Sequence, residues 1–242
     1  MGLSYQGITQ QSMNSAIESD PLKRAYDVID EAFLKYCLVK DESDCGRPIF
    51  DLSRVLVAFN GGKDCTLLLH LILSRAETLP AVTRSIRLMY IRDSPSETFP
   101  EVEDFVDATK KRFSLDSIEV ANGDMRSALG KVVRDHPEVR AIFMGTRWTD
   151  PNAKWMDYFC STSAGWPKMD LVAPILRMSY ADLWRIMAEF AIPYCDLYRR
   201  GYTSIGTVSD TIPNPALKLP DGTYLHANQL TDPSLERHGR TK

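Results

Sequence analysis

The sequence lacks the features of membrane proteins, disulfide-bonded proteins and zinc ribbons. No apolar stretch in the 242 residues reaches the roughly 18 residues that a transmembrane helix needs, so we expect no membrane span. The five cysteines are an odd number and include no CxxC pair, which argues against a disulfide framework and a zinc ribbon. Residues 1–22 contain no Lys or Arg and do not resemble a signal or transit peptide. We therefore expect reduced thiols and a cytoplasmic location.

The chain also lacks a strong excess of charge of either sign. It has 29 Lys and Arg residues against 32 Asp and Glu residues, a net charge of −3. A mildly acidic chain is a poor general binder of nucleic acids, so we expect no nucleic-acid partner. Hydrophobic residues make up 44% of the chain and charged residues 25%, which is typical of a globular domain and excludes a wholly disordered chain.

What the sequence does contain is an alternation of strand and helix patterns. Residues 1–19 are polar and aperiodic and are interpreted as an arm, whereas residues 20–242 are expected to form one domain. Asp20 with Pro21, Asp124 and Ser179 predict helix starts, and 40–48 is predicted to be a loop. The patterns predict strands at 55–59, 86–91, 118–121 and 141–144, and helices at 67–77, 101–113, 125–134 and 179–190. This order predicts an α/β fold with a mainly parallel open sheet over about residues 50–145 and helices on both faces.

The pattern changes after residue 145. Residues 149–167 combine Pro, Gly, Asn and Ser with the aromatic residues Trp155, Tyr158, Phe159 and Trp166. An aromatic-rich segment with loop chemistry favours a lid over a ligand. The last fifty residues are rich in Pro and Gly and are expected to wrap the domain, so that 146–242 forms a lid and C-terminal segment.

The strongest local signal is the loop Asn60-Gly61-Gly62-Lys63-Asp64, which follows the first strand of the predicted sheet. Two glycines allow a sharp turn that gathers backbone N–H groups, and the next helix adds the positive end of its dipole. Lys63 adds a positive charge. This arrangement favours a phosphate group, although an ordinary Gly-Gly turn is the alternative. The Walker pattern and the GxGxxG fingerprint are both absent.

The loop resembles the SGGxDS-type loop of the PP-loop ATP pyrophosphatases, with Asn60 in place of the usual first Ser and Cys65 in place of the last. Other matching segments follow in order: Gly145-Thr146-Arg147-Trp148-Thr149-Asp150-Pro151, Gly165-Trp166-Pro167, residues 199–206 with Asn214-Pro215, and Glu236-Arg237-His238-Gly239-Arg240. With these segments the chain, from about residue 50 to its end, resembles the eukaryotic-type FMN adenylyltransferase (FAD synthase) family of the phosphoadenylyl-sulfate-reductase-like group.

The resemblance implies an adenine nucleotide alpha hydrolase-like fold and a nucleotidyltransferase that converts ATP and FMN into FAD and pyrophosphate, with Mg²⁺. The FMN phosphate would attack the α-phosphorus of ATP in line with the leaving pyrophosphate. Client apoflavoproteins are possible partners of such an enzyme.

The resemblance also implies a role for each matching residue. ATP would be bound by Phe59, Asn60, Gly61, Gly62, Lys63, Asp64, Gly145 and Arg147. The catalytic residues would be Asn60, Asp64, Arg237 and Arg240, with Asp64 holding Mg²⁺. FMN would be bound by Asp150, Trp166 and Ser163. Ser163 stands where the family often has Asp, which predicts a different contact with the flavin there.

Plainer roles stay open for several of these residues. Asp64 would be only a helix N-cap, Asp150 only a turn former and Trp166 only a core residue, while Arg237 and Arg240 would lie in a solvated tail.

Other functions stay open as well. A phosphoadenylyl-sulfate reductase would need a reactive cysteine near the C-terminus, but the last cysteine is Cys195, in a context that reads as a buried segment. A tRNA-modifying PP-loop enzyme would be expected to carry a basic surface or a cysteine pair. A non-catalytic nucleotide-binding module is the third alternative.

Overall fold

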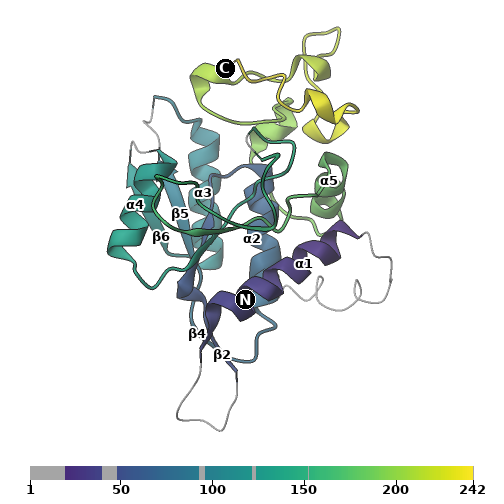
Figure 1. Ribbon diagram of the computed structural model, residues 1–242. Helices are drawn as coiled ribbons and strands as arrows, with labels where there is room; N and C mark the ends of the chain where they lie inside the picture. Colours follow the sequence, from purple (N-terminus) through teal and green to yellow (C-terminus); the bar gives the residue numbers. More distant parts are fainter. Residues whose placement is uncertain (1–19, 40–47, 93–95, 122–123, 152, 242) are drawn as a thin grey trace.

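The computed structural model describes residues 20–39, 48–92, 96–121, 124–151 and 153–241. The predicted arm at 1–19 and most of the predicted loop at 40–48 lie outside them. The centre is a six-stranded sheet with the order β6-β5-β3-β7-β9-β8 (Figure 1). Only the pair β8–β9 is antiparallel. The strands are β3 (Val55–Ala58), β5 (Arg87–Arg92), β6 (Ser117–Ala121), β7 (Ala141–Phe143), β8 (Phe159–Ser161) and β9 (Asp170–Val172).

Three of the helices begin where the sequence carries a capping side chain. Asp20 accepts a hydrogen bond from the N–H of Leu22 at 2.9 Å, Asp124 forms a capping box with Ser127, and Ser179 accepts from the N–H of Asp182. The helices are α1 (Pro21–Ala32), which continues as a π-helical turn (Phe33–Cys37), α2 (Lys63–Ala76), α3 (Pro100–Phe113), α4 (Met125–Asp135) and α5 (Tyr180–Glu189).

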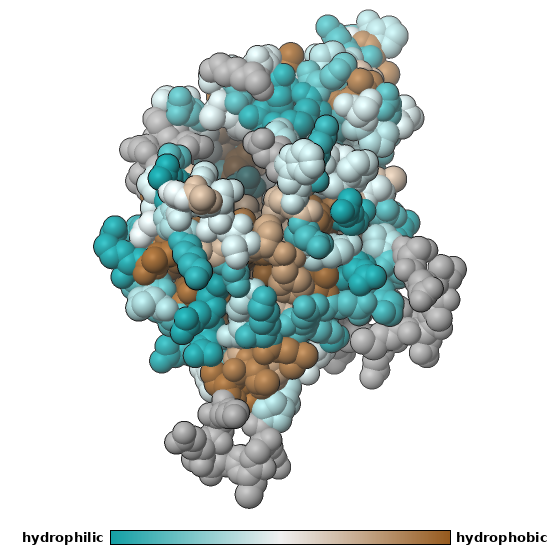
Figure 2. Space-filling view, in the orientation of Figure 1, coloured by the Kyte–Doolittle hydropathy of each residue, from teal (hydrophilic) through white to brown (hydrophobic). Residues whose placement is uncertain are grey.

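A second, three-stranded sheet was not predicted. It consists of β1 (Leu38–Val39), β2 (Ile49–Asp51) and β4 (Val82–Arg84) in the order β1-β2-β4. Its strands have two or three residues, which is too short for an alternating pattern, and all of β4 is exposed. The side chains of Leu38 and Val82 are 42% and 43% exposed. Figure 2 shows apolar surface at this lower end of the molecule.

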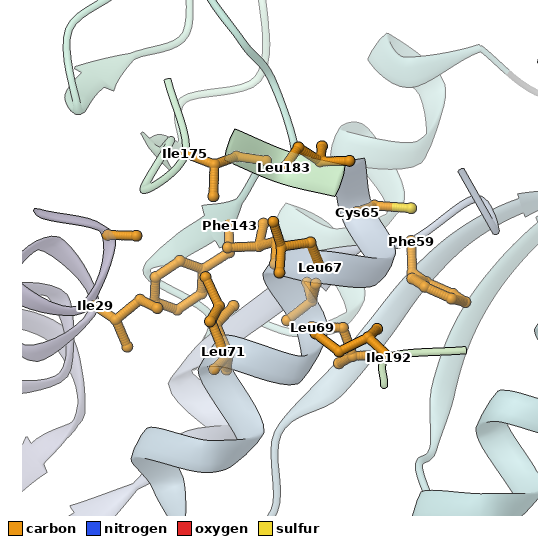
Figure 3. Close-up of a cluster of buried hydrophobic side chains, with 14 of the residues drawn as sticks. Ile29, Phe59, Cys65, Leu67, Leu69, Leu71, Phe143, Ile175, Leu183 and Ile192 are labelled. Atoms are coloured by element: carbon orange, nitrogen blue, oxygen red, sulfur yellow. The ribbon is translucent and has the colours of Figure 1, made fainter. Parts of the chain in front are cut away.

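Both faces of the large sheet are covered. Val55 and Val57 belong to the cluster that contains the buried faces of α1, α2 and α5, whereas Leu56 between them packs with α4. Figure 3 shows the first cluster, in which Phe143 of β7 lies among leucines of α2 and Ile29 of α1. Strands buried on both faces consist almost entirely of apolar residues, as the sequence of β3 does. The prediction of a mainly parallel sheet with helices on both faces is confirmed.

The strand order creates a switch point at β3, which has β5 on one side and β7 on the other. The connection from β3 to β5 runs through α2 on one face, and the connection from β6 back to β7 runs through α4 on the other face. The loops that leave β3 and β7 therefore diverge. In open parallel sheets ligands bind beyond the carboxyl ends of the strands at such a point.

One prediction about the second half of the chain is wrong in detail. Residues 159–161, expected within a loop, form β8, because β9 supplies a hydrogen-bonding partner that local sequence does not reveal. The C-terminal segment lies beyond the carboxyl ends of the strands, at the top of Figure 1. Within the described residues, no helix is both long and apolar enough to span a membrane.

Candidate active site

A cavity of about 470 Å³ lies at the switch point, beyond the ends of β3 and β7. Figure 2 shows the surface hollowed below the C-terminal segment. Its volume falls within the range of small-molecule sites. The predicted site residues among its lining are Phe59, Asn60, Gly62, Lys63, Asp64, Gly145, Asp150, Arg237 and Arg240. The sheet and the C-terminal segment thus bring together residues that lie up to 181 positions apart.

The turn after β3 depends on Gly61. Its φ is +74°, a conformation that side-chain-bearing residues rarely adopt, and an added Cβ would lie 3.0 Å from Val106 of α3. Gly62 has an ordinary φ of −69° and is the N-cap of α2. Its N–H donates to Asn60 Oδ1 at 3.0 Å, so the Asn60 side chain closes the turn. Asn60 therefore shapes the loop from within.

The N-terminus of α2 keeps part of its capacity to bind an anion. The first four N–H groups of a helix have no partner within the helix, and here they belong to Gly62, Lys63, Asp64 and Cys65. Gly62 is satisfied by Asn60, and the Lys63 N–H donates to Tyr198 Oη at 2.8 Å. The N–H groups of Asp64 and Cys65 are therefore the ones that a phosphate group would take.

Gly145 lets the loop after β7 approach this helix end. A Cβ at position 145 would lie 2.7 Å from the backbone nitrogen of Cys65 and 2.9 Å from its Cα. We expect Gly145→Ala to displace the first turn of α2 and to raise the KM for ATP about tenfold, since misplacement of a binding group by about 1 Å is costly. Steady-state kinetics with varied ATP measures this.

Gly130→Ala is the matched control for that prediction. Gly130 lies within α4, and its Cβ would come no closer than 3.8 Å to Pro167. Alanine stabilises a helix more than glycine does, so this variant should keep its KM for ATP and gain slightly in thermal stability. An unchanged KM for ATP in Gly145→Ala would show that the first turn of α2 does not bind the nucleotide.

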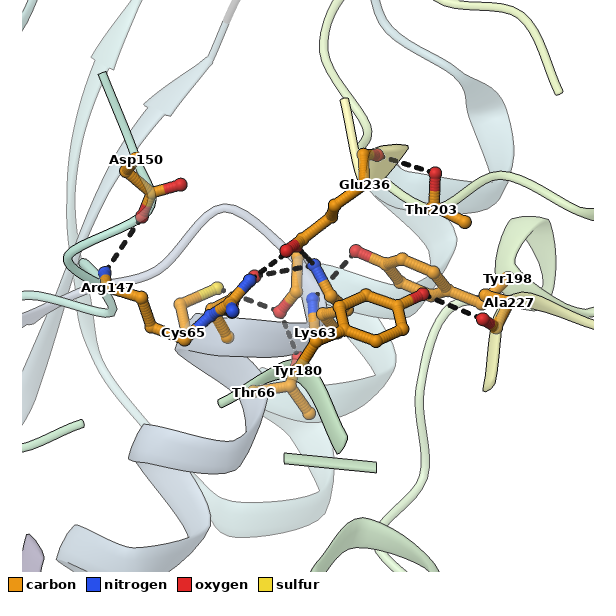
Figure 4. Close-up of polar contacts among 12 residues, drawn as sticks. Lys63, Cys65, Thr66, Arg147, Asp150, Tyr180, Tyr198, Thr203, Ala227 and Glu236 are labelled. Carbon is orange, nitrogen blue, oxygen red and sulfur yellow. Dashed lines mark hydrogen bonds and ion pairs between the residues drawn. The ribbon is translucent and has the colours of Figure 1, made fainter. Parts of the chain in front are cut away.

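Two cations and two carboxylates form a buried network at the floor of the cavity (Figure 4). Lys63 Nζ contacts Asp64 Oδ2 at 3.0 Å and Glu236 Oε1 at 2.6 Å. Arg147 Nε contacts Asp64 Oδ1 at 2.5 Å, and its Nη2 contacts Glu236 Oε1. The side chains of Lys63 and Arg147 are only 2% and 1% exposed. We call these four residues the ion quartet.

The ion quartet changes the interpretation of three predicted residues. Asp64 is not the N-cap of α2, because Gly62 occupies that position and Asp64 binds two cations instead. Arg147 is turned into the protein and does not line the cavity, and Lys63 is engaged by two carboxylates. Both cations hold the floor of the cavity together, and their predicted contact with ATP stays a prediction.

The two aspartates of the site have opposite pKa shifts. Burial alone would raise the pKa of Asp64, but the charges of Lys63 and Arg147 outweigh it and hold the pKa below its ordinary value. For Asp150, burial raises the pKa, and the nearby Asp64 carboxylate adds to this rise. The hydrogen bond that Asp150 accepts from the backbone N–H of Arg147 at 2.8 Å opposes the rise. Asp64 thus stays ionised in acid, whereas Asp150 titrates closer to neutral pH.

The tail brings two arginines to the cavity wall. Arg237 is exposed, and no ion pair joins it to the described part of the chain. Arg240 Nη2 contacts Asp210 Oδ2 at 2.9 Å, while its buried Nε has no partner among the described residues. The guanidinium lies so close to Gly206 that a Cβ there would collide with it. Arg240 therefore does not lie in a freely solvated tail, whereas Arg237 is exposed at the wall of the cavity.

The predicted FMN residues separate into two groups. Asp150 lines the cavity. Ser163 and Trp166 lie on the exposed turn between β8 and β9 and do not line it. This turn rests against α4, where Arg126 donates to the carbonyl of Gly165. Trp166 is 41% exposed, so it is not a core residue, and contact of either residue with FMN stays a prediction.

Several residues of the site had no predicted role. Glu236 was seen only as part of the tail motif, and Tyr198, Met125, Thr146, Ser204 and Ile205 also line the cavity. No local signal marks Tyr198, whose hydroxyl is brought to α2 by tertiary packing. No local signal marks Glu236 either, because its partners Lys63 and Arg147 lie far away in the sequence.

The thiols of Cys65 and Cys195 are poorly suited to redox chemistry. Burial raises the pKa of Cys65 to about 12 and that of Cys195 to about 11, so both stay protonated at neutral pH. Cys195 is buried, as its context predicted. This argues against the interpretation as a phosphoadenylyl-sulfate reductase, which needs a reactive thiolate.

The donor set can be compared with the needs of Mg²⁺. Within the described residues, no three His, Cys, Asp or Glu side chains gather in a metal-binding arrangement. Mg²⁺ commonly takes one or two carboxylates and completes its shell with water and substrate phosphates. Asp64 fits this role, because a carboxylate has about four acceptor positions and the two cations occupy two.

Comparison with known proteins agrees with this geometry. The family model of the phosphoadenosine phosphosulfate reductase domain matches residues 54–213. The chain is 42% identical over 192 residues to the probable FAD synthase of Schizosaccharomyces pombe, covering 77% of this chain and 71% of that protein. It is 34% identical over 197 residues to the probable FAD synthase of Caenorhabditis briggsae, covering 79% of this chain but 37% of that longer protein.

A solved structure shows the same architecture over nearly the whole chain. The crystal structure of Candida glabrata FMN adenylyltransferase in complex with FAD and inorganic pyrophosphate has a TM-score of 0.80 and 26% sequence identity, and the match covers 95% of this chain and 92% of that one. Together with the match at 42% identity, this shows that the chain belongs to the FAD synthase family and has the fold of the phosphoadenosine phosphosulfate reductase domain.

Proposed function

We propose that this protein is an FMN adenylyltransferase that makes FAD and pyrophosphate from FMN and ATP. The observation that carries the proposal is the cavity at the switch point. One space is lined by the N-terminal turn of α2, by Asp150 and by the two tail arginines Arg237 and Arg240. These groups suit a triphosphate, a flavin and a leaving pyrophosphate, and relatives named for this reaction share the fold and the sequence.

The reaction needs positioning and positive charge more than proton transfer. The nucleophile is a phosphate oxygen of FMN that is already an anion, so no general base is required. The obstacles are the repulsion between two polyanions and the charge that develops on the departing pyrophosphate. The N-terminus of α2 would hold the ATP phosphates, and Arg237 and Arg240 would stabilise the leaving group.

Asp64 would provide the protein ligand for Mg²⁺. When bound, the ion supplies charge neutralisation between the ATP phosphates. Asp64 is ready for this because the two cations of the ion quartet keep its pKa low. Gly61, Gly62 and Asn60 would fix the loop around the phosphates.

Asp150 would bind FMN by accepting a hydrogen bond from the imide N–H of the flavin ring, which requires the carboxylate form. Because the pKa of Asp150 is raised, we expect the KM for FMN to increase as the pH falls through that pKa, at a higher pH than for an ordinary aspartate. Asp150→Asn can keep the hydrogen bond from the Arg147 N–H, but its amide NH₂ would face the flavin N–H as a second donor.

Kinetics with varied FMN between pH 4 and pH 8 test that role. Asp150→Asn should raise the KM for FMN about tenfold or more at neutral pH, abolish its pH dependence and leave the KM for ATP nearly unchanged. Asp221→Asn is the control, since Asp221 is exposed and bonds only within its own turn to Thr223. A flat KM for FMN in the parent enzyme across this pH range would contradict the proposed contact.

The activity itself is tested by incubating the purified protein with ATP, MgCl₂ and FMN and separating FAD by chromatography. We expect FAD and pyrophosphate in equal amounts. A parallel incubation with radiolabelled phosphoadenylyl sulfate and a dithiol should release no sulfite; release of sulfite without FAD would favour the reductase. The proposal places the enzyme in the cytoplasm, with client apoflavoproteins as receivers of the product.

A further inference from the structure

Glu236 lies between the phosphate loop and the tail, and both its side chain and its main chain are held. It is only 7% exposed, and its Oε1 bridges the two cations of the ion quartet, Lys63 and Arg147. A buried carboxylate that accepts from two cations has a defined position, because moving it would leave buried charges unpaired. In Figure 4 its side chain reaches down from the tail toward the start of α2.

The main chain at Glu236 is fixed by two buried polar side chains. Thr203 Oγ1 donates to the carbonyl of Glu236 at 2.6 Å. Asn214 Nδ2 donates to Thr203 Oγ1 at 2.7 Å and to the carbonyl of Leu235 at 2.8 Å. Thr203 and Asn214 are 1% and 0% exposed. Thr203 lies in the matching segment 199–206, and Asn214 lies in the matching pair Asn214-Pro215. The proposed reaction gives neither segment a direct role.

The two tail arginines follow directly from this anchored residue. Arg237 is the next residue, and the N–H of Arg240 donates to the carbonyl of Arg237 at 2.9 Å, so residues 237–240 form one turn. The turn is held at its far end, where Ile212 donates to the carbonyl of Gly239 and Thr241 donates to that of Asp210. Glu236 therefore holds the near end of the turn that carries both arginines, while Asp210 binds the Arg240 guanidinium at the far end.

We infer that Glu236 is a positioning residue for FAD synthesis: through Lys63 and Arg147 it ties the tail to the phosphate loop and so places Arg237 and Arg240 against the leaving pyrophosphate. This rests on the proposed function. Glu236 touches no reacting atom in this role. Glu236 would affect turnover only through Arg237 and Arg240. An experiment can therefore distinguish this effect from a general effect of Glu236 on folding.

A double-mutant cycle between Glu236→Gln and Arg240→Ala tests the inference. Gln keeps the shape of the side chain but removes the charge that binds both cations. We expect Glu236→Gln to lower kcat about tenfold or more in the parent enzyme but less than threefold in the Arg240→Ala background, because the group through which it acts is then absent. The KM for FMN should change less than threefold, since Asp150 keeps its contacts.

Limited trypsin digestion gives a readout that does not depend on activity. Arg237 and Arg240 are themselves cleavage sites, and the tail of Glu236→Gln should be cut there faster than the tail of the parent. The matched control is Asp232→Asn, which removes a charge four residues earlier from an exposed turn whose capping bond to Ser234 an Asn can keep. It should match the parent in both experiments.

Several outcomes would overturn the inference. They are an unchanged kcat in Glu236→Gln, equal effects of Glu236→Gln with and without Arg240, and tighter ATP binding in the variant, which would mean that the carboxylate competes with phosphate. If Glu236→Gln does not fold, as judged by circular dichroism, Glu236→Asp takes its place in the cycle, because it keeps the charge and shortens the reach by one methylene. If the parent protein makes no FAD, the proposed function fails instead.

Discussion

Arg240→Ala is expected to lower the turnover of FAD synthesis by about 10²-fold or more, which is the usual cost of removing a donor that acts in the transition state. The guanidinium is fixed by Asp210 at 2.9 Å and lies against Gly206, and its buried Nε has no partner among the described residues. A planar cation held in this way can take two phosphate oxygens at once. Arg237→Ala should have an effect of similar size, because Arg237 lines the same cavity.

Single-turnover and steady-state assays of FAD formation measure this effect. Arg199→Ala is the matched control, since Arg199 is 64% exposed, contacts Asp196 at 3.6 Å and the ring of Tyr194, and lies outside the cavity lining. It should retain the parent kcat. Full turnover in both Arg237→Ala and Arg240→Ala would show that the tail arginines take no part in the reaction.

Arg147→Met is expected to lower the free energy of unfolding by about 3–5 kcal/mol, the usual cost of removing one partner of a buried ion pair. The side chain is 1% exposed and binds both Asp64 and Glu236, so its loss leaves two buried carboxylates with Lys63 alone. The methionine side chain fills most of the volume of the arginine, so the effect reports mainly on charge.

Urea unfolding followed by circular dichroism measures this change, and for a domain of this size each kcal/mol lowers Tm by roughly 2–4 °C. Arg134→Met is the control, because Arg134 is 70% exposed and pairs with Asp135 on the surface of α4, where an ion pair contributes less than about 1 kcal/mol. Equal stability of the two variants would mean that the ion quartet is dispensable for the fold.

Local signals predicted most of the large sheet and its helices. Asp20, Asp124 and Ser179 marked three helix starts, and the apolar run of β3 indicated a strand buried on both faces. The glycine loop was recognised because Gly61 needs a conformation that other residues rarely adopt. By contrast, β8 and the three strands of the small sheet are too short to carry a period of their own. They exist because neighbouring strands complete their hydrogen bonds.

Motifs predicted the candidate site residues but not how these residues are arranged. Lys63 was expected to face the phosphates, yet it is buried against Glu236, which lies 173 residues further along the chain. Asp64 was left open between an N-cap and a metal ligand, and Gly62 takes the N-cap position. The antiparallel pairing of β8 and β9 puts the turn with Trp166 and Ser163 on the surface, and their contact with FMN stays a prediction.

The sequence by itself determined the alternation of strands and helices, the sharp turn at Gly61 and the family to which the chain belongs. The first two depend on backbone conformation and on the spacing of apolar residues, which are local properties, and the family was indicated by the resemblance of several short motifs in the order of the chain. Only the tertiary structure decided which charges neutralise one another and which face the cavity. An ion pair depends on distances of a few ångströms between segments that the chain brings together only by packing, and no local pattern encodes such a distance.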